Sequence, residues 1–233
     1  MNDKLKQFFE QNANNKFDWP ELPAGNMYSQ TNWILHECTA PWFEIHGIDT
    51  PYKAMLAEAQ SLKDMFVGHR DEEDKHRGWR SLAIHGIEAT KTNIPETYGL
   101  NSDEVTYDWT EIQDRCPETV KFFKETFPYD EYMRVRFMLL EPGGYIMPHS
   151  DNQKCFLGAA INISLNQPDN CVMVNKYGTL PFRDEGSMFF FNNHYEHAVC
   201  NDSDTDRIHI IVHGRYNMQK LAPLMIDSWP KQR

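Results

Sequence analysis

The chain has 233 residues, of which 40% are hydrophobic and 13% aromatic, and this is enough for a single domain with a sizeable core. Its formal net charge of -11 disfavours nucleic acid as a partner, because nucleic-acid binders usually present a basic face to phosphates. No apolar run is long enough for a membrane helix, so no membrane partner is expected. The sequence starts without a secretory signal, and its five cysteines contain no CxxC pair. We therefore expect a cytoplasmic protein with reduced thiols.

The first 130 residues are predicted to form a helical and mixed outer layer. Met55, Leu56, Ala59, Leu62 and Phe66 fall at helical spacing after Pro51, which suits the first turn of a helix. The charged run from Val67 to Gly78 is predicted to be a solvated loop. Helices are expected over residues 1–16, 51–67 and 117–127, and strands near 42–48 and over 78–87, with irregular chain through most of 17–50.

Short strand-like runs follow one another after residue 130 and are separated by turn residues such as Pro-Gly-Gly and Gln-Pro-Asp-Asn. The first run, YMRVRFMLL, is expected to be followed by a turn at the Pro-Gly-Gly and by a second short strand. Further strands are predicted within 158–166, 171–178, 186–193 and 207–216. This spacing predicts a mainly β fold, a double-stranded β-helix (a cupin-like jelly roll) over 131–216, flanked by α-helices from the N-terminal half. Residues 217–233 are expected to be a C-terminal extension.

A candidate metal site lies where the second of these strands ends. His149 and Asp151 are two positions apart, so in extended chain both side chains point to one side and can reach one ion. His197, after the apolar run SMFFF, is the preferred third ligand, and His194 is its competitor. Two histidines and one carboxylate on one face of an ion are typical of non-haem iron(II) sites with open positions. The similar tripeptide His69-Arg70-Asp71 is interpreted as solvated surface because it lies in the charged loop.

An arginine ten positions after His197 adds a second element to this pattern. Arg207 lies on the apolar run RIHIIVHG, and its guanidinium matches a carboxylate with two hydrogen bonds. We expect it to bind the distal carboxylate of a cosubstrate, or to form an ion pair with Asp204 or Asp206. His209 shares its face and either adds a hydrogen bond to that carboxylate or fills the core.

In its ensemble of motifs, the sequence resembles the aspartyl/asparaginyl β-hydroxylase family of 2-oxoglutarate oxygenases. The resemblance covers roughly residues 75–216 and is carried by GWRSLAIHG, FMLLEPGGYIMPHSD and GSMFFFNNHYEHAVCNDSDTDRIHIIVHGRY. It implies a jelly-roll core and iron(II) held by His149 and His197 together with Asp151. It also implies 2-oxoglutarate anchored by Arg207, and O2 as the oxidant. The peptide hydroxylases of animals have Gly in place of Asp151, so this chain looks closer to the free amino-acid hydroxylases, and its carboxylate argues against a halogenase.

Substrate-binding residues are predicted on three strands. Arg136 and Arg134 share one strand face and are expected to bind a substrate carboxylate or to pair with surface acids. Asn162 and Ser164 are expected to line the pocket or to face solvent. Trp79 and Arg80 are predicted at the pocket mouth, with core packing as the alternative for Trp79. His85 and His213 are predicted to be structural.

The function that combines these features is an iron(II)- and 2-oxoglutarate-dependent dioxygenase. It would hydroxylate an amino acid or an amino-acid side chain while converting 2-oxoglutarate to succinate and CO2, with a small molecule or a peptide as its partner. Two alternatives remain. One is a metal-binding cupin of non-oxygenase function, such as an isomerase or a small-ligand binder, which would not need Arg207. The other is a non-catalytic scaffold in which the histidines and Asp151 are incidental.

Overall fold

The computed structural model describes residues 3–70, 75–151, 154–155, 157–158, 160–182 and 186–232. The α-helices are α1 (Asp3–Asn12), α2 (Met27–His36), α3 (Tyr52–Ser61), α4 (Pro117–Glu125) and α5 (Met218–Ser228), with short 3-10 turns at Lys63–Met65, Pro95–Tyr98, Ser102–Glu104, Gln113–Arg115 and Trp229–Gln232. The strands are β1 (Trp42–Ile45), β2 (Val67–Gly68), β3 (His76–Gly86), β4 (Asp108–Trp109), β5 (Tyr129–His149), β6 (Ile161–Ser164), β7 (Cys171–Asn175), β8 (Gly178–Thr179), β9 (Met188–Phe191), β10 (His197–Asn201) and β11 (Arg207–Tyr216).

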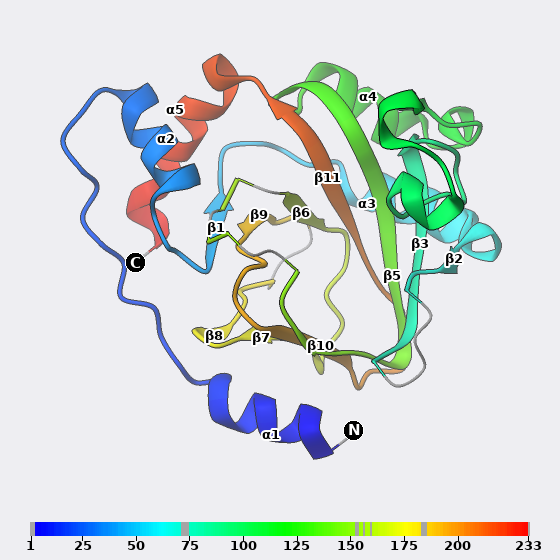
Figure 1. The fold of residues 1–233 in the computed structure, drawn as a ribbon, viewed down its shortest axis with the longest axis horizontal. Coiled ribbons are helices and arrows are strands. Elements are labelled where there is room, and N and C mark those ends of the chain that lie inside the picture. The colour runs from blue at the N-terminus through cyan, green and yellow to red at the C-terminus, as the bar shows by residue number, and fades with distance from the viewer. Residues whose placement is uncertain are drawn as a thin grey trace.

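The strands form a curled antiparallel sheet, shown in Figure 1, in the order β1-β9-β6-β11-β5-β10-β7-β8. The first half of β5 pairs with β11, whose other edge pairs with β6 and then β9. The second half of β5 pairs with β10, which continues to β7 and β8. The chain therefore contributes alternately to two facing layers that share β5, which is a double-stranded β-helix. The predicted fold class is confirmed.

The Pro142-Gly143-Gly144 sequence does not reverse the chain, so the prediction of a turn between two separate strands was wrong. β3 pairs with both halves of β5 in one direction, from Leu140 to Ile146, with a register shift opposite the glycines. Gly143 has a φ of 69°, and a Cβ on Gly144 would lie 2.7 Å from the Glu141 carbonyl oxygen. The glycines thus form a bulge, at which β5 changes its partner from β11 to β10.

The helices cover the outside of the curled sheet. α3 and α4 lie beside the β3 and β5 side, and α2 lies against α5 on the opposite side, as Figure 1 shows. α1 buries Leu5, Phe8 and Phe9 against β5, β7 and β10. α2 forms within a segment expected to be irregular, so that expectation was wrong, and α5 forms within the C-terminal extension, for which no helix was predicted. The flanking helices therefore come from both ends of the chain.

Several short strands were also not predicted, among them β10 and β2. β10 carries His197 as its first residue, and β2 lies within the segment expected to be a solvated loop. β2 pairs with β3, and the backbone N–H of His69 then donates to the Trp79 carbonyl oxygen at 2.8 Å. This pairing brings His69 and Arg70 against the sheet.

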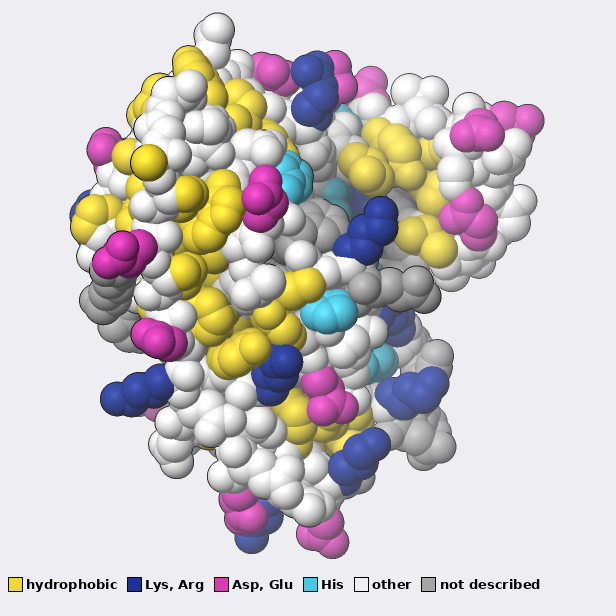
Figure 2. Space-filling model, turned by 60° about the vertical axis from the view of Figure 1, so that its left-hand side comes forward, with side chains coloured by type: hydrophobic (Ala, Val, Ile, Leu, Met, Phe, Trp, Pro, Cys, Tyr) yellow, Lys and Arg dark blue, Asp and Glu magenta, His cyan; other side chains and the backbone are white. Residues whose placement is uncertain are grey.

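Acidic and basic side chains are scattered over the face drawn in Figure 2, and hydrophobic side chains gather on both sides of its centre. The same face is hollowed, and histidine and Lys or Arg side chains border the recess. None of the described helices is both long and apolar enough to cross a membrane.

Candidate metal centre and cosubstrate site

Three side chains that could hold a metal ion converge at one end of β5 and β10. His149 ends β5, Asp151 follows it, and His197 begins β10, where it is the direct cross-strand partner of His149. Asp151 Oδ1 lies 3.5 Å from His149 Nε2, and Asp151 Oδ2 lies 3.8 Å from His197 Nε2. The ligand atoms of the three residues all lie within 4.8 Å of one another, close enough for a single ion.

Both imidazoles are held in the tautomer that a metal requires. His149 Nδ1 lies 2.8 Å from the Met147 carbonyl oxygen, and His197 Nδ1 lies 2.9 Å from the Tyr195 carbonyl oxygen. Because a carbonyl oxygen can only accept, each Nδ1 must carry the proton and donate it. Each Nε2 then presents a lone pair toward Asp151, and the buried His149 Nε2 has no hydrogen-bond partner.

The charges around the triad favour a carboxylate and a neutral His197. Burial raises the pKa of Asp151, but the neighbouring His149, the hydrogen bond from Arg70 and the nearby His197 outweigh it and hold the pKa well below its usual range. Burial, together with the neighbouring His149, lowers the pKa of His197 to about 4. Burial also opposes protonation of His149, but Asp151 and the Met147 carbonyl raise its pKa overall. At neutral pH the triad therefore offers a carboxylate and at least one neutral imidazole.

His194 does not belong to this group. It lies in the segment before β10 and contacts the ring of Tyr195, with centroids 5.5 Å apart, while the metal-competent cluster among the described residues is formed by His149, Asp151 and His197. The two rings that do face each other, His149 and His197, have centroids 4.4 Å apart.

Arg207 is buried in the same cavity with part of its guanidinium unsatisfied. Its Nε donates to Gln167 Oε1 at 3.1 Å and its Nη1 donates to His209 Nδ1 at 3.1 Å, while Nη2 has no partner. The guanidinium lies over the ring of Phe182, 4.8 Å from its centroid. Among the described residues no carboxylate lies within ion-pair distance of Arg207, and Asp206 pairs with Lys63 instead. A buried cation with a free N–H group is suited to an incoming carboxylate.

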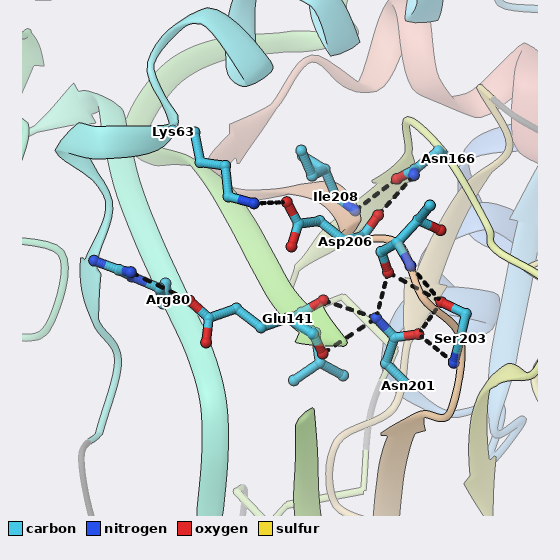
Figure 3. A network of polar contacts seen from close by, with 10 residues as sticks. Lys63, Arg80, Glu141, Asn166, Asn201, Ser203, Asp206 and Ile208 are labelled. Carbon is cyan, nitrogen blue, oxygen red and sulfur yellow. Dashed lines mark hydrogen bonds and ion pairs between the residues drawn. The ribbon is translucent and has the colours of Figure 1, made fainter. Parts of the chain in front are cut away.

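The turn that leads into Arg207 is held by the polar network in Figure 3. Asn201 Nδ2 donates to the carbonyl oxygens of Leu140 at 2.9 Å and Thr205 at 2.8 Å. Asn166, two residues after the end of β6, binds the backbone on both sides of Arg207: it donates to the Asp206 carbonyl at 2.8 Å and accepts from the Ile208 N–H at 2.6 Å. Because the backbone on both sides of Arg207 is fixed, its side chain enters the cavity in a defined position.

The triad and Arg207 line one cavity of about 570 Å³. Its wall also contains His209, Arg136, Asn162 and Trp79, so these predicted residues lie together. Arg136 is only 5% exposed; its Nη1 donates to the Thr92 carbonyl at 2.7 Å, and its Nε has no partner. Burial, with the charges of Arg134 and Arg70, lowers the pKa of Arg136 to about 9. Arg136 is therefore buried and does not pair with a surface acid, which was one of the two roles expected for it.

Arg80 lies away from the cavity, contrary to its predicted place at the pocket mouth. Its guanidinium donates to Glu141 Oε1 at 3.2 Å and to the Phe66 carbonyl at 2.5 Å, because successive residues of a strand point to opposite faces and Trp79 takes the cavity side. Ser164 is fully buried and its hydroxyl lies 3.4 Å from the Asn166 carbonyl oxygen, so it does not face solvent. His85 packs against Trp109 and Tyr132, in keeping with a structural role.

Several cavity residues were missed by the sequence-based reasoning. His69 and Arg70 were interpreted as solvated surface, but His69 is 4% exposed, and its Nδ1 lies 3.0 Å from Ser81 Oγ. Asp71, the third residue of that tripeptide, lies outside the described residues. His213, expected to be structural, also lines the cavity. Its alternation with Arg207 and His209 along β11 was a usable signal, since every second residue of a strand shares a face.

The comparisons with known proteins agree with the predicted family. The model of a family described as aspartyl/asparaginyl beta-hydroxylase matches residues 44–215, well over half of the chain. No curated protein matches the sequence. Among solved structures, the chain is similar to a prolyl-4-hydroxylase from Pseudomonas putida, with 13% identity, a TM-score of 0.45, and coverage of 82% of this chain and 99% of that chain. It is also similar to a Trichoplax adhaerens prolyl hydroxylase in complex with a hypoxia inducible factor peptide fragment, with 12% identity, a TM-score of 0.45, and coverage of 84% and 90%.

Proposed function

Because the chain belongs to the aspartyl/asparaginyl β-hydroxylase family, we propose that it hydroxylates an amino acid that carries a free carboxylate. Family membership makes it a hydroxylase dependent on iron(II) and 2-oxoglutarate, with O2 as the oxidant. The reaction consumes 2-oxoglutarate and O2 and yields succinate, CO2 and a hydroxylated product. What remains to be proposed is which residues perform it and on which class of substrate.

We assign iron(II) to His149, Asp151 and His197. The donor set supports this assignment, since two neutral imidazole nitrogens and one carboxylate are the ligands of non-haem iron sites. The His149 Nε2 atom that lacks a partner supports it independently, because a buried lone pair without a donor is costly unless a cation occupies the site. When bound, the metal supplies the oxidising chemistry, while the protein positions the reactants and excludes water.

We assign the distal carboxylate of 2-oxoglutarate to Arg207. The assignment is supported by the free Nη2 atom, by the absence of a neighbouring acid among the described residues, and by the location of Arg207 and the triad in one cavity. His209 accepts a hydrogen bond from Arg207 and is neutral, because burial first and the charge of Arg207 second lower its pKa well below the usual value. It therefore orients the guanidinium without competing for the carboxylate.

The single observation that carries the substrate class is that Arg136 is buried and forms no ion pair with any of the described residues. Once Arg207 is used by the cosubstrate, Arg136 and its neighbour Arg134 remain in the cavity wall, and the Nε atom of each has no partner. Burying a guanidinium without a counter-ion is unfavourable, so a substrate carboxylate would compensate both residues. Asn162 and Trp79 would contact the rest of a small substrate. The five free cysteines support a reducing compartment such as the cytoplasm.

Succinate formation tests this function directly. The iron-loaded protein would be incubated with 2-oxoglutarate and a candidate substrate. Each free amino acid is compared with its amide, and short peptides are tested separately. Turnover with acids but not with amides is expected, and it should be lost in Arg136→Gln but kept in Arg215→Gln, whose guanidinium pairs with exposed Glu131 outside the cavity. Turnover with peptide side chains alone would overturn the substrate class. Metal binding without any binding of 2-oxoglutarate would instead support the cupin alternative.

A further inference from the structure

Arg70 forms an ion pair with the carboxylate of the triad. Its Nη1 atom lies 2.9 Å from Asp151 Oδ1, and its guanidinium lies 6.0 Å from the centre of the Trp79 ring. Arg70 lies two residues after the end of β2, so the ion pair links the segment after β2 to the segment after β5. Both residues line the cavity.

The backbone at Arg70 has an unusual conformation. His69 is held by Trp79 through its backbone and by Ser81 through its ring, and Arg70 then adopts a φ of 54°, a conformation that few residues other than glycine take. This strained conformation therefore occurs at a residue that contacts Asp151. Strained backbone at a cavity wall is typical of residues whose position matters for function.

The two oxygens of Asp151 are consequently not equivalent. Oδ1 accepts the hydrogen bond from Arg70 and lies 3.5 Å from His149 Nε2, while Oδ2 lies 3.8 Å from His197 Nε2. An iron site that takes 2-oxoglutarate through two atoms and O2 through one needs three free positions, so its carboxylate ligand must use one oxygen only. A carboxylate whose second oxygen is not held by a hydrogen bond can bind the metal through both oxygens and so occupy two coordination positions.

We propose that Arg70 is a positioning residue that restricts Asp151 to a single ligand oxygen and thereby keeps a coordination position open for the cosubstrate. The proposal rests on the proposed function of the triad. It gives Arg70 a role distinct from that of Arg136 and Arg207, because it acts through a metal ligand and not by binding a carboxylate of either substrate.

The test compares Arg70→Met and Arg70→Lys with the control Arg77→Met, which removes a cation from the same region of β3 but from outside the cavity. Titration of anaerobic protein with Mn2+ measures metal affinity, and a second titration of the Mn2+-loaded protein measures 2-oxoglutarate affinity. In Arg70→Met the Mn2+ dissociation constant should stay within about threefold of wild type, because two effects oppose each other. Loss of the hydrogen bond that orients Asp151 weakens metal binding, whereas loss of the positive charge of Arg70 removes its repulsion of the metal ion. The 2-oxoglutarate dissociation constant should rise about tenfold, with Arg70→Lys in between.

A change in the visible absorption of the Co2+-loaded protein provides a readout independent of turnover. Arg70→Met should alter this spectrum, since the number of ligand oxygens changes, while Arg77→Met should leave it as in wild type. Unchanged 2-oxoglutarate affinity and spectrum in Arg70→Met would overturn the proposal, as would a rise in the substrate KM alone, which would make Arg70 a substrate contact. Failure of the wild-type protein to bind Mn2+ and 2-oxoglutarate would instead overturn the function proposed for the site.

Discussion

His149 and His197 are direct partners across the antiparallel pair of β5 and β10, although they lie far apart in the sequence. Each donates its Nδ1 proton to a carbonyl oxygen two residues earlier, Met147 for one and Tyr195 for the other. The sheet register thus presents both Nε2 atoms on one face, and it does so through backbone hydrogen bonds that form with the fold. The pair proposed to bind the metal is therefore positioned by strand pairing, and its imidazoles need no rearrangement.

Removal of His197 should abolish metal binding, while removal of His194 should not. His197→Ala takes away a ligand, so the Mn2+ dissociation constant should rise by more than the roughly 10- to 100-fold typical of residues that only support a ligand. His194→Ala is the matched control from the same segment and should stay close to wild type. Calorimetric titration measures both, with circular dichroism to verify folding. Equal losses in the two variants would contradict the assignment of the third ligand.

Replacement of Arg207 should weaken cosubstrate binding without affecting the metal. Arg207→Met loses a charge-assisted hydrogen bond worth about 1.5–3 kcal/mol, so the KM for 2-oxoglutarate should rise roughly 10- to 100-fold. Mn2+ affinity should be unchanged because no triad residue contacts Arg207. Arg215→Met, which removes an exposed arginine from the far end of β11, serves as the control. An unchanged KM in Arg207→Met would show that the cosubstrate carboxylate binds elsewhere.

The bulge in β5 should tolerate a side chain at one glycine and not at the other. Gly144→Ala places a Cβ 2.7 Å from the Glu141 carbonyl oxygen and 2.9 Å from the Arg77 carbonyl oxygen, so backbone must move. Gly143→Ala meets nothing within 4 Å and suffers only the strain of its φ of 69°, about 1–2 kcal/mol. Urea unfolding should therefore show a larger loss of stability for Gly144→Ala, accompanied by weaker Mn2+ binding, because the bulge sets the path of β5 to His149.

The free energy of unfolding should fall as the pH is lowered from 7 to 5. Burial first, and the charge of Arg136 second, lower the pKa of His69 to about 2, and burial holds the pKa values of His209 and His213 well below the usual value. The unfolded chain binds protons at these residues near pH 6.5 whereas the folded protein does not. Protons therefore favour unfolding, by about 2 kcal/mol for each such histidine at pH 5.

His69→Gln should make this pH dependence smaller by about 2 kcal/mol at pH 5, relative to wild type. Denaturant unfolding of the metal-free proteins at several pH values measures the difference. The same slope in His69→Gln and wild type would contradict the buried, neutral state of His69.

Much of the fold was predictable because it depends on local patterns. The strands after residue 130 show alternation and are bounded by turn residues, and the helices at α3 and α4 show apolar residues at helical spacing after a proline. α2 and α5 escaped prediction because they are stabilised mainly by long-range packing, against each other and around Trp229. The Pro-Gly-Gly sequence was misinterpreted because a turn and a bulge use the same residues.

For the site itself, the sequence indicated the pair His149 and Asp151, two positions apart where a strand ends, and Arg207, whose charge in an apolar strand requires a ligand or a partner. Only the tertiary structure decided the rest. Cross-strand register selects His197 over His194, strand alternation turns Trp79 inward and Arg80 outward, and the pairing of β2 with β3 brings Arg70 to Asp151. Each of these outcomes depends on which distant segments pair and in which register, and no local pattern encodes that choice.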